Sequence, residues 1–145
     1  MKVLFGMCGL LIAAILFCTV PAQPQALEGD YVIVANKELQ GSSISTAILK
    51  GIYLREVLSW GNGAGEIVPV DLTTQSGFYQ SLFGKSYVQM QAYWLNMRIK
   101  HSAELPVSKK DAEAVKQFVA EKKGAIGFIR NSDLDDRVKV LKVVN

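Results

Sequence analysis

The residues best suited to bind a ligand follow one another in one turn near the middle of the chain. Thr73, Thr74, Gln75, Ser76 and Gly77 supply hydroxyl groups, an amide, and a glycine that allows close approach to the backbone. The surrounding apolar residues predict a strand before this turn and a helix after it. Because the first N–H groups of a helix lack partners, such a turn could hold a small anion. The alternative is a plain turn with Ser76 as a helix cap.

Other residue types that carry catalysis or bind metal ions are sparse. His101 is the single histidine, and both cysteines, Cys8 and Cys18, lie in an apolar N-terminal segment. The sequence shows neither a histidine–carboxylate pair close together nor the spacing of a metal site. We therefore expect no enzymatic activity, no catalytic or metal-binding residue and no cofactor.

The N-terminal segment has the pattern of a secretory signal peptide. A basic start at Lys2 is followed by an almost wholly apolar run over 3–20 and then by Pro21 and Ala22. We predict cleavage after Ala22, with Ala26 as the second candidate. A retained membrane anchor is the alternative, because about 18 apolar residues approach the length that spans a bilayer. We expect residues 1–22 to be a signal peptide, and residues 23–145 to be periplasmic or secreted, touching the membrane only before cleavage.

Composition places the rest of the chain among ordinary globular domains. The 145 residues include 16 basic and 13 acidic side chains, a formal net charge of +3, and the lysines are scattered. This charge is too small to predict nucleic-acid binding. The roughly 120 residues that follow the signal segment are enough for one domain with its own core.

Hydrophobic periodicity predicts alternating strands and helices. The expected strands span 31–36, 66–70, 125–129 and 138–143. The expected helices span 45–53, 78–83, 86–100 and 109–122, the last with a cap at Ser108. The first strand is apolar throughout, which is typical of a central strand, whereas alternation in the last strand predicts an edge. This order of elements predicts an α/β domain.

The helix predicted over 86–100 carries two apolar stripes instead of one. The members of the two stripes are Tyr87, Met90, Trp94 and Met97, and Val88, Ala92, Leu95 and Ile99. Together the stripes are too wide for a surface helix, so we expect this helix to be largely buried.

Several short segments occur in an order that is typical of one protein family. They are residues 43–54, Trp60-Gly61-Asn62-Gly63, Ile67-Val68-Pro69-Val70, Ser76-Gly77, Tyr93-Trp94 and Gly124-Ala125-Ile126-Gly127-Phe128. In this order they resemble the substrate-binding proteins of phosphate ABC transporters, and more closely the short, single-lobe members of the periplasmic-binding-protein superfamily. The resemblance implies one periplasmic-binding-protein-like lobe over residues 23–145, with a mixed sheet flanked by helices.

The resemblance also implies what the central turn has kept and lost. In the family this turn carries an arginine that grips phosphate, followed by Ser-Gly-Thr at the start of a helix. Here Leu72 stands in place of the arginine, Phe78 in place of the threonine, and Thr74 where an acidic residue is common; Ser76 and Gly77 match. Leucine supplies neither the charge nor the paired hydrogen bonds of a guanidinium.

Two functions follow from this reading. The first is a solute-binding lobe with a degenerate site at Thr73–Gly77 for a small oxyanion such as phosphate, working with an ABC transporter or with a subunit that completes the cleft. The alternative is an interaction module for another envelope protein that keeps the lobe fold without binding phosphate. The retained polar run favours the first, and the lost arginine favours the second, because a fold does not bring its site with it.

Overall fold

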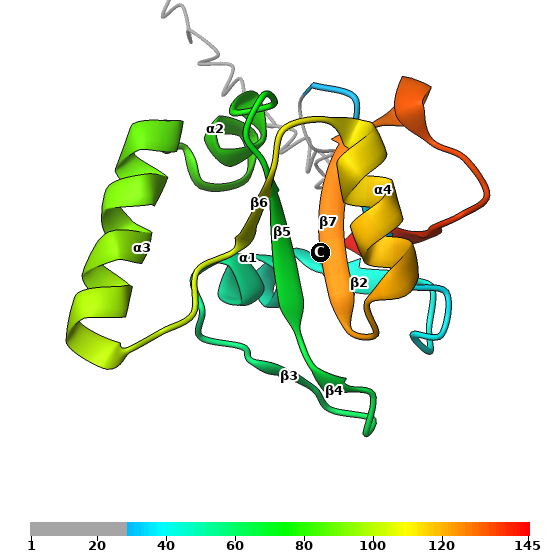
Figure 1. The fold of residues 1–145 in the computed structure, drawn as a ribbon, viewed down its shortest axis with the longest axis horizontal. Coiled ribbons are helices and arrows are strands. Elements are labelled where there is room, and N and C mark those ends of the chain that lie inside the picture. The colour runs from blue at the N-terminus through cyan, green and yellow to red at the C-terminus, as the bar shows by residue number, and fades with distance from the viewer. Residues whose placement is uncertain (1–28) are drawn as a thin grey trace, which may run out of the picture.

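A six-stranded mixed sheet forms the centre of the molecule (Figure 1), and the structure, a computed structural model, describes residues 29–145. The strand order is β2-β8-β1-β7-β5-β6. These strands are β1 (Tyr31–Ala35), β2 (Ser43–Ser45), β5 (Val68–Leu72), β6 (Val107–Lys109), β7 (Ala125–Arg130) and β8 (Lys139–Val144). A separate two-stranded ribbon joins β3 (Ser59–Trp60) to β4 (Gly65–Glu66). The predicted signal peptide, residues 1–22, lies outside the described residues.

β1 lies in the middle of the sheet, as its continuous apolar sequence predicted. It pairs antiparallel with β7 on one side, where Tyr31 faces Arg130, and antiparallel with β8 on the other, where Ile33 faces Leu141. β5 runs parallel to both β6 and β7. The edge position predicted for the last strand is wrong, because β2 pairs with β8 and covers it. β2 is three residues long and contains two serines, so its own sequence gives no strand signal.

Four helices accompany the sheet, which confirms the predicted mixed α/β class. They are α1 (Thr46–Tyr53), α2 (Gly77–Phe83), α3 (Tyr87–His101) and α4 (Ala112–Glu121). Figure 1 shows α4 in front of the sheet and α1 behind it. Two of the helices begin with a side-chain cap: Ser45 accepts a hydrogen bond from the Ile48 N–H, and Ser86 forms a reciprocal capping box with Gln89.

α4 begins later than its sequence pattern predicted. Asp111, rather than Ser108, is the N-cap, and its carboxylate accepts a hydrogen bond of 2.8 Å from the Ala114 N–H. Residues 107–109 form β6 instead, because they pair with β5 and Leu72 faces Lys109. The strand pairing outcompetes the local capping signal.

The expectation that α3 is largely buried is wrong. Only Met90 and Trp94 of this helix are buried, and Val88, Leu95 and Ile99 are 72%, 55% and 74% exposed. Figure 1 shows α3 at the side of the molecule, away from the strands. One stripe therefore faces the domain, and the other faces outward.

The core lies between the sheet and the helices and is rich in aromatic rings. Phe78 stacks on Phe128 with a centroid distance of 3.7 Å, and Tyr53 packs edge-on against both. All three rings are fully buried. Within residues 29–145, no helix is both long and apolar enough to cross a bilayer.

Candidate functional site

The turn predicted to bind a ligand lies at the carboxyl end of β5. Because β5, β6 and β7 run parallel, the residues that follow all three strands meet at the same edge of the sheet. The residues brought together there are the turn 73–77, Lys109–Lys110 and Arg130. In open α/β sheets, ligands bind beyond the carboxyl ends of the strands. The edge is therefore a suitable place for a binding site.

Thr73 and Thr74 attach the turn to the neighbouring strand. The Thr73 N–H and hydroxyl both donate to the Lys109 carbonyl, at 3.0 and 3.3 Å, and the Thr74 hydroxyl donates to the Lys110 carbonyl at 3.1 Å. Their protons are thus directed at the backbone. In this arrangement the two threonines brace the turn and do not point donors at a ligand.

Gln75 contacts a cation that sequence reasoning missed. Its side-chain oxygen Oε1 accepts a 2.9 Å hydrogen bond from Nε of Arg130, and the guanidinium lies 5.8 Å from the centre of the Tyr31 ring. Arg130 is exposed and ends β7, just after the predicted strand 125–129. A sequence signal did exist: an arginine directly after a buried strand. Only the parallel pairing of β5 and β7 shows that it reaches the turn.

Ser76 and Gly77 begin α2 and are both exposed. The Ser76 hydroxyl makes no capping bond, so it does not serve as the cap that the plain alternative requires. The N–H groups on either side, of Gln75 and Phe78, donate to the carbonyls of Leu72 and Gln75, respectively. A Cβ atom on Gly77 would lie 3.0 Å from the Tyr31 hydroxyl oxygen, so this glycine allows Tyr31 to approach the helix start.

Two of the positions that differ from the family pattern, 72 and 78, belong to the core. Leu72 is 1% exposed and Phe78 is fully buried. An arginine at position 72 would therefore carry its charge into an apolar environment, which is costly without a partner. A cation contacts the turn from β7 instead, through the bond of Arg130 to Gln75.

A buried carboxylate lies just before the turn. Asp71, within β5, is 1% exposed and accepts hydrogen bonds from the hydroxyls of Tyr79 at 2.7 Å and Tyr87 at 2.6 Å. Burial raises the pKa of Asp71, while the hydrogen bonds of Tyr87, Tyr79 and Ser108 oppose that rise. The carboxylate joins β5 to α2 and α3, and so fixes the strand end from which the turn begins.

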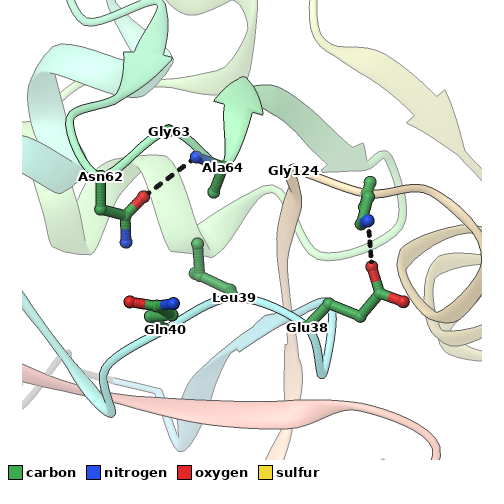
Figure 2. Close-up of a pocket in the computed structure, with 8 residues that line it drawn as sticks. Glu38, Leu39, Gln40, Asn62, Gly63, Ala64 and Gly124 are labelled. Atoms are coloured by element: carbon green, nitrogen blue, oxygen red, sulfur yellow. Dashed lines mark hydrogen bonds and ion pairs between the residues drawn. The ribbon is translucent and has the colours of Figure 1, made fainter.

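A hollow of about 330 Å³ lies at the opposite edge of the sheet (Figure 2). It lies between the loops at 38–40 and 62–64, beside Gly124, which directly precedes β7. Glu38 forms an ion pair of 2.9 Å with Lys123 there, so the single lysine at the hollow is already neutralised. None of the turn residues lines this hollow, and its charges do not favour an anion.

Comparison with solved structures identifies the fold. No protein-family model matches the sequence. The structure is similar to an ABC-type phosphate transport receptor from Vibrio cholerae, with a TM-score of 0.59 and 21% identity over 79% of this chain and 46% of the receptor. It is also similar to a phosphate ABC transporter substrate-binding protein from Clostridium perfringens, solved with bound phosphate, with a TM-score of 0.56 and 21% identity over 79% of this chain and 44% of that protein. The similarity to PstS from Borrelia burgdorferi has a TM-score of 0.56 and 16% identity over 79% of this chain and 47% of PstS.

This chain spans less than half the length of each of these proteins. At such identities the likeness concerns the fold, and fold alone does not transfer a site. The resemblance predicted from the order of short sequence segments is confirmed at that level: the chain has the fold of the substrate-binding proteins of phosphate ABC transporters.

Proposed function

We propose that the chain is a non-enzymatic, solute-binding-like protein that holds a small oxyanion such as phosphate weakly at the turn 73–77. The observation that supports this most is the 2.9 Å contact between Arg130 and Gln75. It places an exposed cation at the turn where Leu72 has replaced the arginine of the family pattern. The phosphate-transport proteins with the same fold support the choice of ligand class.

The donors available for an oxyanion converge from the turn and from the end of β7. Because Gln75 accepts from Arg130 through Oε1, its Nε2 keeps two donor hydrogens for another group. The Ser76 hydroxyl makes no capping bond, and the start of α2 adds the backbone N–H groups of Ser76 and Gly77. Arg130 adds the Nη groups of its guanidinium, whose fork geometry fits two oxygens of one phosphate.

The affinity expected for such a site is low. A hydrogen bond to a charged group contributes about 1.5–3 kcal/mol, and two or three of them must also offset the entropy lost on association. The net result is about −4 kcal/mol, which corresponds to binding around the millimolar range. The exposed site leaves the anion open to water on one side, so added salt should weaken binding.

The cellular setting is part of the proposal. The signal-peptide pattern of residues 1–22 supports export to the periplasm or the medium. An ABC transporter is the partner that the solved structures with this fold suggest, since two of them are described as ABC transport proteins. The exposed edge with the turn 73–77 would face such a partner, which could close the site from its open side.

Isothermal titration with phosphate tests the site, with Arg130→Gln as the decisive variant. We expect the parent to bind at about millimolar concentration and Arg130→Gln to bind at least about tenfold more weakly, because one charge-assisted contact is lost. The phosphate affinity of Arg130→Lys should lie between these two values, since lysine keeps the charge but lacks the paired N–H donors of the guanidinium. Lys110→Gln removes an equal charge from the same edge and should change binding by less than about twofold.

Folding of each variant is checked by its thermal melt. If the folded parent gives no heat with phosphate or sulfate, or if Lys110→Gln weakens binding as much as Arg130→Gln, the specific site does not exist. The alternative would then take its place: an envelope interaction module that keeps the lobe fold. The burial of Leu72 and Phe78 favours that alternative, because both family ligand positions now serve the core.

A further inference from the structure

The outward face of α3 carries an apolar stripe that no described residue covers. Its members are Val88, Ala92, Leu95 and Ile99, at successive spacings of four, three and four residues. All four are exposed, and the three large ones are more than half exposed. The spacing matches the seam between two paired helices, where apolar residues recur every 3.5 residues on average. A large exposed apolar surface of this kind marks an interaction site.

The opposite face of the same helix is already in use. Trp94 donates from Nε1 to the Tyr53 carbonyl at 2.8 Å, and the Tyr93 hydroxyl donates to the Leu54 carbonyl at 2.8 Å. Met90 and Trp94 are buried against the core. α3 is therefore fixed to its own domain by one face, and presents the outward stripe on a rigid helix.

We propose that the outward stripe binds the same stripe of a second copy of this chain, with the two α3 helices antiparallel about a two-fold axis. The axis passes between Ala92 and Leu95. Each Leu95 then lies opposite the small Ala92 of the other copy, and each Val88 lies opposite Ile99 of the other copy. Such a contact is self-complementary, as a two-fold interface requires.

The polar residues beside the stripe favour this arrangement. α3 contains no acidic residue, and its fixed positive charges, Arg98 and Lys100, lie near its C-terminal end. In the antiparallel pair Arg98 lies beside the neutral Gln91 of the other copy, and Gln89 lies beside Asn96. A parallel pair would align the two helix dipoles, whereas the antiparallel pair opposes them.

A second copy also fits these flanks better than a lipid surface does. Helices that lie on membranes carry many lysines and arginines beside the apolar face. The flanks of this stripe consist mainly of neutral amides: Gln89, Gln91 and Asn96. Amides on one side of the seam can bond with one another across an antiparallel helix pair, as the positions of Gln89 and Asn96 allow.

The contact is small, so the dimer should be reversible. From Val88 to Ile99 the stripe rises about 16 Å along the helix, and paired helices lie about 8–10 Å apart. One helix pair lies at the low end of specific interface sizes, which indicates a transient complex. We expect half-dissociation at roughly tens to hundreds of micromolar protein.

Sedimentation velocity of the purified protein over a wide concentration range tests the dimer. Leu95→Glu should lower the association constant by at least about tenfold, because it places two carboxylates in an apolar seam. Leu58→Glu is the matched control: Leu58 is 51% exposed, close to the 55% of Leu95, but lies before β3 and outside α3. It should leave association unchanged.

Cross-linking tests the antiparallel register in a Cys8→Ala/Cys18→Ala background. In an antiparallel pair, Ala92→Cys residues are offset by about 4–5 Å along the helix axis, whereas Val88→Cys residues are offset by about 16 Å. A short bifunctional maleimide should therefore link Ala92→Cys dimers efficiently and Val88→Cys dimers poorly. Equal linking at both positions would indicate a parallel pair and overturn the proposed register.

Three results would overturn the proposal itself. The first is that the parent protein stays monomeric at millimolar concentration. The second is that the dimer persists in Leu95→Glu. The third is that Leu58→Glu lowers the association constant as much as Leu95→Glu does. A monomer that binds vesicles of anionic lipid through Leu95 would assign the face to a membrane surface instead. Association through the apolar N-terminal segment is recognised because it does not respond to Leu95→Glu.

Discussion

α3 and α4 are attached to the rest of the domain by different kinds of contact. α4 buries Val115 and Val119 against β7, where Gly127 leaves room: a Cβ atom there would lie 3.1 Å from Val115 and 3.3 Å from Val70. α3 is held by the polar ends of aromatic side chains as well as by apolar packing, since Tyr87 and Trp94 reach hydrogen-bond acceptors inside the domain. Close aliphatic packing joins α4 to the sheet, whereas α3 combines the burial of Met90 and Trp94 with directed hydrogen bonds.

The two helices also differ in how their apolar residues are buried. On α4 the apolar residues Val115 and Val119 are buried on one face. Two stripes on α3 predicted burial on both sides, yet the domain covers one side only. An apolar stripe shows that a face needs a partner, but it does not say whether the partner belongs to the same chain.

The largest expected effect separates the two faces of α3. Trp94→Ala should lower the free energy of unfolding by about 3–5 kcal/mol, because it leaves a cavity and removes the bond to the Tyr53 carbonyl. Leu95→Ala, on the next residue but the outer face, should change it by less than about 0.5 kcal/mol. Urea denaturation at low protein concentration measures both. Similar losses in the two variants would show that the two faces of α3 do not differ in burial.

The next largest effect concerns the hydrogen bond from Tyr87 of α3 to Asp71, whose contribution to stability should depend on pH. Burial raises the folded pKa of Asp71 above its unfolded value of about 3.9, so Asp71 reduces stability as the pH rises through the folded value. The Tyr87 hydroxyl counteracts this by favouring the ionised form. Tyr87→Phe should therefore cost little near pH 3 and about 1.5–3 kcal/mol at neutral pH.

Tyr93→Phe provides the matched control for Tyr87→Phe. It removes a hydroxyl from the same helix, but that hydroxyl donates to the uncharged Leu54 carbonyl. Its cost should stay constant between pH 3 and 7. Denaturation series at several pH values distinguish the two variants, and equal pH dependence would contradict the assigned role of Asp71.

The smallest of these effects concerns the start of α4. Asp111→Ala should lower the free energy of unfolding by about 1 kcal/mol, because the Ala114 N–H loses its partner. Lys110→Ala, next to it and also exposed, should have a much smaller effect. A calorimetric melt measures the difference, and a greater loss in Lys110→Ala would mean that Asp111 is not the cap.

Local signals in the sequence predicted those elements that local interactions determine. The apolar run of β1 and the apolar periodicity of the helices depend on neighbours in the chain, as do the side-chain caps that the structure shows at Ser45 and Ser86. β2 and β6, in contrast, are three residues long and exist because β8 and β5 pair with them. Such strands have no signal of their own, since the pairing partner lies far away in the sequence.

The candidate site shows the same limit. The turn 73–77 was located from its residue types, but Arg130 reaches it only through the parallel pairing of β5 and β7. Asp71 follows the strand predicted over 66–70, whereas in the structure it lies in β5 and accepts hydrogen bonds from two tyrosine hydroxyls. Whether a polar side chain is exposed or enclosed depended on α2 and α3, which follow it.

The central place of β1 has a consequence for the order in which the molecule can form. A ribosome or an export channel releases β1 before its two neighbours, β7 and β8, which are the last two strands of the described residues. The middle of the sheet must therefore wait until residues 125–144 have emerged, and such non-local pairing is slow to form. For a protein that we propose is exported, this delay keeps the chain unfolded while it passes through the export channel.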